Sequence, residues 1–200
     1  MTSVQKTVVV LTAIVALVVG LTVNKVLNGK GETDPVALLD AGIVALTGTD
    51  GAPFALEQLN GKWSLLFFGY TFCPDICPTT LAQLRELQGK LPQAARDNLQ
   101  MVFVSIDPGR DTPEHLKEYL GFYKAGFIGV GGELPAIQTL ANGVSIPFIP
   151  ADTSKPNYTV DHSGNLVLVG PDGRQRGFIR APLNAQKLLA QLPALLTSSQ

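Results

Sequence analysis

Basic side chains are never clustered in this sequence, and that absence excludes the simplest kind of nucleic-acid-binding surface. Lys and Arg together number 15 against 16 Asp and Glu, which gives a formal net charge of −1 and a pI near 6.1. Proteins that bind nucleic acid usually carry a basic patch or a Lys/Arg run, and no such run is present. We therefore expect no nucleic-acid partner.

Cysteine is also scarce, with two in 200 residues. A small secreted domain held together by disulfides needs more of them. The chain is long enough for one ordinary domain plus an appendage, and its 46% hydrophobic residues can fill a core. Internal repeats and low-complexity tracts are absent. The sequence thus predicts one domain with its own core, in which two closely spaced cysteines have some other purpose.

Charge is missing altogether from residues 7–23, which read TVVVLTAIVALVVGLTV. A helix crosses a bilayer with about 17–25 apolar residues, and Val26 and Leu27 can extend this run. A cleaved signal peptide has a shorter apolar stretch and a small-residue cleavage site, which does not follow Val23. Lysines flank the run on both sides, so charge does not fix its orientation. The predicted organisation is a short tail 1–6, a transmembrane anchor 7–27, a tether 28–41 and a globular domain 42–200.

From residue 42 onward, strand patterns alternate with helix patterns. The run 63–70 is continuously apolar, as expected of a strand buried on both faces, and 100–106 is predicted to be a second buried strand. Shorter strands are predicted at 43–46, 127–130, 166–169 and 174–179. Helices are predicted at 78–91, 112–120, 134–142 and 184–196, from apolar spacing and from Pro or capping residues at their starts. An irregular, proline-containing insertion is expected at 146–158.

This order favours an α/β fold with a central sheet flanked by helices on both faces. A Pro171-Asp172-Gly173 turn joins the last two strands as a hairpin, so the sheet should be mixed rather than all parallel. A strand, a C-x-x-x-C segment and a helix, followed later by a hairpin and a last helix, are typical of a thioredoxin-like domain. We predict that fold, preceded by one N-terminal transmembrane helix.

The two cysteines lie in the segment 69–78, GYTFCPDICP, where a buried strand gives way to a helix. Cys73 and Cys77 are about one helical turn apart, close enough for a disulfide or a shared metal ion. Pro74 and Pro78 restrict the backbone between and after them. A nearby helix N-terminus should lower the pKa of the thiols. The alternative is that both cysteines simply pack in the core.

Histidine offers few candidates for a further ligand, because the chain has only two. Two thiolates suit Cu(I), and an imidazole can complete a three-coordinate site. His162 lies just ahead of the predicted strand 166–169, in a loop that can reach the sheet edge carrying the cysteines. The alternative for His162 is a loop histidine bonded to a neighbour such as Asp161. His115, on the first turn of a helix, is expected to be solvated.

Three motifs occur in order: TFCPDICP at 71–78, DPGRDT at 107–112 and VDHS at 160–163. Together they resemble the Sco/SenC family, over about 42–196. The resemblance implies a thioredoxin-like fold in which Cys73, Cys77 and His162 bind one copper ion, Cu(I) or Cu(II). The residue types of DPGRDT are themselves explained by a turn and a helix cap, so we interpret that motif as structural.

The resemblance also implies a role and a place in the cell. Sco/SenC proteins help to load the dinuclear copper centre of cytochrome c oxidase subunit II, and other copper chaperones are further possible partners. They lie on the outer face of the bacterial plasma membrane or on the mitochondrial inner membrane. An Arg/Ser-rich transit peptide is absent, so we expect a single-pass protein of the bacterial inner membrane with its globular domain in the periplasm.

Three functions are compatible with these residues. We favour a copper metallochaperone, a binding and transfer protein rather than an enzyme. The same dithiol, Cys73 and Cys77, can serve a membrane-anchored thiol–disulfide oxidoreductase instead. That chemistry does not require His162, and its usual motif in this fold is C-x-x-C. A peroxidase, with Thr71 and an arginine such as Arg110 or Arg180 near Cys73, is disfavoured because it needs one activated cysteine with a distant partner.

Overall fold

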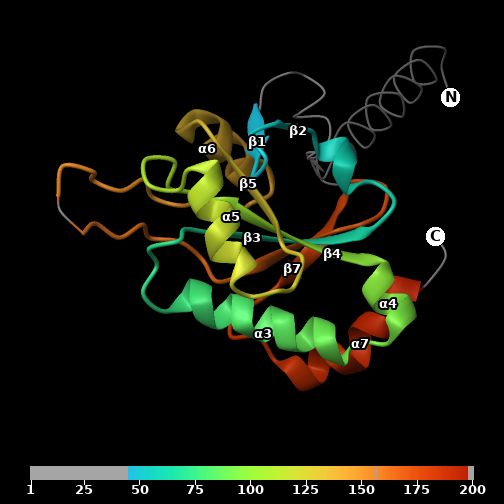
Figure 1. The fold of residues 1–200 in the computed structure, drawn as a ribbon. Helices are drawn as coiled ribbons and strands as arrows, with labels where there is room; N and C mark the ends of the chain where they lie inside the picture. Colours follow the sequence, from blue (N-terminus) through green and yellow to red (C-terminus); the bar gives the residue numbers. More distant parts are fainter. Residues whose placement is uncertain (1–44, 156, 198–200) are drawn as a thin grey trace, which may run out of the picture. The chain divides into compact units, whose positions relative to one another are not determined.

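A computed structural model describes residues 45–155 and 157–197 of the chain (Figure 1). The predicted tail 1–6, anchor 7–27 and tether 28–41 lie outside the described residues, as does most of the strand predicted at 43–46. Within the described part, none of the helices has the length and apolar character needed to cross a membrane.

In the part of the chain that the structure describes, a seven-stranded mixed sheet forms the centre of the domain, in the order β2-β1-β5-β4-β3-β6-β7. Strand β3 pairs in parallel with β4, and β4 with β5, whereas all other neighbours are antiparallel. The predicted mixed sheet is therefore confirmed. The strands are β1 Leu46–Gly48, β2 Pro53–Phe54, β3 Trp63–Gly69, β4 Leu99–Ser105, β5 Ile128–Gly132, β6 Leu166–Val169 and β7 Gln175–Ile179.

Helices pack on this sheet in two groups. Helix α7 contacts both α3 and α4, and Figure 1 shows α3 and α7 side by side. Helices α5 and α6 both contact β5. The helices are α3 Ile76–Lys90, α4 Gln93–Asp97, α5 Pro113–Gly121, α6 Leu134–Gly143 and α7 Ala185–Thr197, with a 3-10 turn at Leu56–Leu59.

The core is centred on β3 and β4, and it aligns the ends of these two strands. Every residue of β3 is buried, as is every residue of β4 except the half-buried Gln100. Phe67 and Phe103 are register partners whose rings meet edge to face at 5.8 Å. Gly69 and Ser105 are partners at the carboxyl ends of the strands. The cysteine segment and the DPGRDT segment, which follow them, therefore start side by side.

The observed elements differ from the predicted ones mainly at their ends. Helix α3 begins at Ile76 rather than Pro78, so Cys77 lies inside its first turn. Proline is tolerated there because the first N–H groups of a helix have no partner within it. The short α4 and β2 were not predicted, since five and two residues are too few to show a period.

Candidate metal centre

The two cysteines lie where β3 ends and α3 begins, and Gly69 makes room for the second of them. A Cβ atom at residue 69 would lie 2.6 Å from the Sγ of Cys77, so only glycine allows the strand to approach the thiol this closely. Cys77 is completely buried and Cys73 is 8% exposed. Both are free thiols. The close packing fixes where the Cys77 sulfur lies relative to the end of the sheet.

The imidazole of His162 lies against Cys77, from a loop distant in sequence. Its Nε2 is 3.2 Å from the Cys77 Sγ, and its Nδ1 is 2.9 Å from the carbonyl oxygen of Val160. A carbonyl oxygen can only accept, so Nδ1 carries a proton, and in the neutral ring Nε2 is then the nitrogen with the lone pair. The Tyr70 ring packs edge-on at 5.4 Å. The histidine is thus held in the tautomer that can bind a metal ion, by Val160 rather than by Asp161.

The structure brings the three predicted ligands together. One donor atom each from Cys73, Cys77 and His162 lies within 4.8 Å of the others. Two sulfurs and one imidazole nitrogen make a soft donor set, which suits copper, and Cu(I) in particular. His115 is not part of this group: it is half-buried and stacks on Phe72 with ring centroids 5.4 Å apart, rather than being solvated.

The electrostatics of Cys77 differ from the prediction. Burial raises the pKa of its thiol well above the ordinary value, although a hydrogen bond from the Tyr70 backbone acts in the opposite direction. The expected lowering by the helix start is wrong for this residue, because desolvation of an enclosed thiolate outweighs it. The raised pKa favours the neutral thiol, so binding of a metal ion by the Cys77 thiolate releases a proton.

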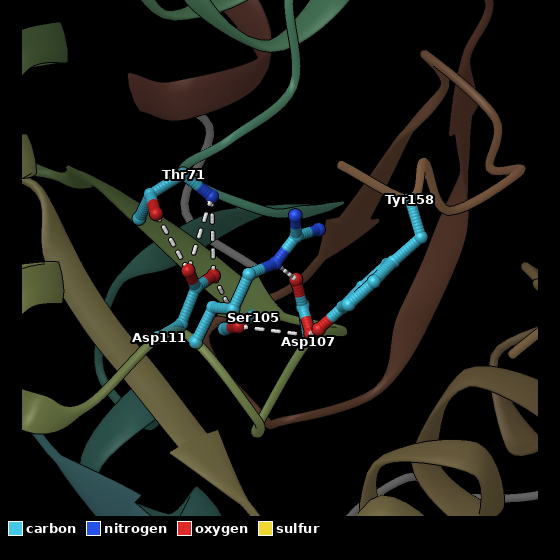
Figure 2. Close-up of polar contacts among 6 residues, drawn as sticks. Thr71, Ser105, Asp107, Asp111 and Tyr158 are labelled. Atoms are coloured by element: carbon cyan, nitrogen blue, oxygen red, sulfur yellow. Dashed lines mark hydrogen bonds and ion pairs between the residues drawn. The ribbon is translucent and has the colours of Figure 1, made fainter. Parts of the chain in front are cut away.

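The DPGRDT segment does more than turn the chain. The predicted cap is present, since Thr112 Oγ1 accepts from the His115 N–H at 3.2 Å. In addition, Asp111 is only 5% exposed, and its carboxylate accepts hydrogen bonds from three donor groups (Figure 2). They come from the Thr71 N–H at 3.1 Å, the Thr71 hydroxyl at 2.6 Å and the Ser105 hydroxyl at 2.6 Å. Burial raises the pKa of Asp111, while these bonds lower it.

Thr71 is two residues before Cys73, in the segment 70–75 between β3 and α3, here called the cysteine loop. Asp111 therefore fixes the start of the cysteine loop. Interpreting DPGRDT as turn and cap alone missed this contact. The partners are 40 residues apart, and no local pattern reports a bond over that separation. Burial of Asp111 would have indicated such a contact, because buried polar groups are hydrogen-bonded. That burial is seen in the folded structure and not in the sequence.

Comparison with known proteins is consistent with this geometry. The family model described as SCO1/SenC matches residues 42–197. A protein of Stutzerimonas stutzeri that is named as copper-binding is 50% identical over 155 residues, which is 78% of this chain and 76% of that protein. The mitochondrial protein SCO2 of Saccharomyces cerevisiae is 39% identical over 131 residues, or 64% of this chain. The match covers 44% of SCO2, less than half its length.

A solved structure gives the same picture of the fold. Copper-bound ScoI of Bradyrhizobium japonicum is 30% identical, with a TM-score of 0.67 over 76% of this chain and 96% of that one. The likeness extends over nearly all of that solved chain, so it concerns the whole domain rather than one motif. It supports the thioredoxin-like α/β fold expected from the sequence.

Proposed function

Because this chain belongs to the SCO1/SenC family, we propose that it is a copper metallochaperone whose Cys73, Cys77 and His162 bind one copper ion. The observation that carries the proposal is the orientation of His162. Its Nε2 lone pair faces the Cys77 sulfur, while its Nδ1 proton is held by the Val160 carbonyl. The copper-binding name of one relative and the copper in the structure of another support the choice of metal.

The site is built to hold copper as cargo that can be passed on. Cys77 is enclosed, whereas Cys73 keeps 8% exposure and His162 is half-buried. A partner's ligands can therefore reach the ion from the side of Cys73 and His162. Three donors leave room for an incoming ligand, so transfer can proceed by ligand exchange without unfolding of the site.

The proposed recipient is cytochrome c oxidase subunit II, at its dinuclear copper centre. The three motifs that resemble the Sco/SenC family support this partner, and other copper chaperones would supply the ion. A second candidate function is reduction of the recipient's thiols. It is favoured by one observation, two free thiols close enough to form a disulfide. His162 has no necessary part in that exchange, and this is why we place copper transfer first.

The proposal is tested by titrating the reduced full-length protein, in detergent and without oxygen, with Cu(I). We expect one tightly bound ion per chain, and X-ray absorption should show two sulfur neighbours and one nitrogen neighbour. Oxidation with a disulfide reagent should abolish binding and reduction should restore it, because a disulfide offers no thiolate. A site with sulfur neighbours only would remove His162 from the ligand set.

We also propose that the globular domain is periplasmic and that residues 7–27 anchor it in a bacterial inner membrane. The uncharged run 7–23 supports the anchor, and a pair of thiols that can form a disulfide suits an oxidising compartment. Alkaline phosphatase fused after Gln200 should be active. The same reporter fused after Lys6, ahead of the run, should be inactive. The reverse pattern would contradict the proposed topology.

A further inference from the structure

Two buried aspartates on one segment contact the two loops that carry the ligands (Figure 2). Asp111 holds Thr71 in the cysteine loop, as described above. Asp107, four residues earlier and 4% exposed, contacts the other loop: its Oδ1 accepts from the Tyr158 hydroxyl at 2.8 Å. Tyr158 is four residues before His162. The segment 107–111 thus contacts both the cysteine loop and the stretch from Tyr158 to His162, here called the histidine loop.

The bond between Asp107 and Tyr158 belongs to a closed set of three side chains. The other carboxylate oxygen of Asp107, Oδ2, accepts from Nε of Arg110 at 2.6 Å. The guanidinium of Arg110 lies 3.6 Å from the centroid of the Tyr158 ring. Each residue therefore contacts the other two. A buried carboxylate with a cationic donor and a hydroxyl donor makes strong, well-oriented hydrogen bonds.

Between Tyr158 and His162 the backbone has little regular structure to hold it. Residues 157–160 belong to no helix or strand, and one isolated bridge joins Asp161 to Ile149. Val160 is buried, and its carbonyl oxygen holds the His162 ring. The side chain of Tyr158 is therefore one attachment of this stretch, on its N-terminal side, in addition to the buried side chain of Val160.

Both aspartates are hydrogen-bonded to the same residue of the sheet, Ser105 at the end of β4. Its hydroxyl donates to Asp111 at 2.6 Å and accepts from the Asp107 N–H at 3.2 Å. The cysteine loop and the histidine loop are therefore positioned against one residue. A shift of either loop changes the distance between the thiols and the imidazole.

We propose that Tyr158 and Asp107 are positioning residues, which hold His162 at the distance where its imidazole and the two thiols share one copper ion. The inference rests on the proposed function. A loop that is already ordered does not have to be ordered when copper binds, so affinity is higher. Groups that orient a metal ligand typically change metal affinity about 10–100-fold.

Tyr158→Phe is the mildest test, because it removes the hydroxyl and keeps the ring beneath Arg110. We expect Cu(II) affinity to fall about tenfold, Cu(I) affinity to fall less, and the Cys73–Cys77 potential to stay unchanged. In the metal-free protein, NMR order parameters of residues 159–163 should decrease. Asp107→Asn should change these quantities in the same direction. Asp152→Asn is the matched control, since Asp152 lies in the same insertion and, among the residues that the structure describes, its side chain contacts nearby Ser154 and Lys155.

A double-mutant cycle separates positioning from a general loss of stability. In a His162→Ala background, Tyr158→Phe should cause no further loss of copper affinity, because its effect passes through the imidazole. An equal loss in both backgrounds would overturn the inference, and so would Tyr158→Phe with wild-type affinities and order parameters. If His162→Ala itself left copper binding unchanged, the three-ligand site would fail instead, and the order parameters would still report on the attachment.

Discussion

Replacing either Cys73 or Cys77 by serine should abolish tight Cu(I) binding. A serine hydroxyl is a hard, weak ligand that stays protonated at neutral pH, so one thiolate and one imidazole remain. Removing a group that only orients a ligand lowers metal affinity about 10–100-fold, and the loss of Cu(I) affinity here should be larger. Competition with a Cu(I)-specific chelator under anaerobic conditions measures it. Each single variant should also be unable to form the internal disulfide.

The fold should survive these substitutions, which makes the result interpretable. Serine is nearly isosteric with cysteine, and at position 77 its hydroxyl can donate to His162 Nε2 as the thiol does. Thr80→Ser is a matched control, because Thr80 is buried on the same helix, α3, and does not belong to the group of three copper ligands. It should keep Cu(I) affinity unchanged. Stoichiometric Cu(I) binding at wild-type affinity in either cysteine variant would show that the paired-thiolate site is wrong.

How much of the fold the sequence predicts depends on how many residues carry each signal. Strand β3 was predictable because burial on both faces requires a continuous apolar run. The hairpin of β6 and β7 was predictable from its Pro-Asp-Gly turn, and β6 has the predicted bounds. Helix α4, with five residues, leaves no periodic trace. The start of α3 was placed two residues late, because a proline is compatible with several positions in a first turn.

The site was predictable as far as it depends on residue types and not on packing. With two histidines in the chain, few ligand sets were possible, and spacing placed both cysteines at one strand end. The pKa of Cys77 was predicted in the wrong direction, because its burial arises from residues far away in the sequence. The bond between Asp107 and Tyr158, 51 residues apart, was missed for the same reason. The local sequence pattern indicates which side chains are available for a site, whereas tertiary packing determines which groups those side chains contact.

His162→Ala is the substitution that decides between copper transfer and thiol reduction. We expect copper affinity to fall, by more than about a hundredfold for Cu(II), above the range for orienting groups, and by less for Cu(I). Two thiolates can hold Cu(I) in a linear site, whereas Cu(II) requires further nitrogen or oxygen donors. The imidazole therefore supplies a larger share of the Cu(II) coordination energy. Removing it should leave Cys73 and Cys77 free to exchange with disulfides.

The deciding measurement combines two quantities on the same purified variant. Copper affinity is measured in both oxidation states, and the Cys73–Cys77 potential is measured against glutathione, where about 30 mV corresponds to a tenfold change. His115→Ala is the matched control, because His115 stacks on Phe72 beside the cysteine loop but lies outside the donor group. Weakened copper binding with a potential within about 30 mV of wild type supports the three-ligand metallochaperone. Unchanged affinity in both oxidation states would remove His162 from the site, and the two thiols would then be better explained as a reductase.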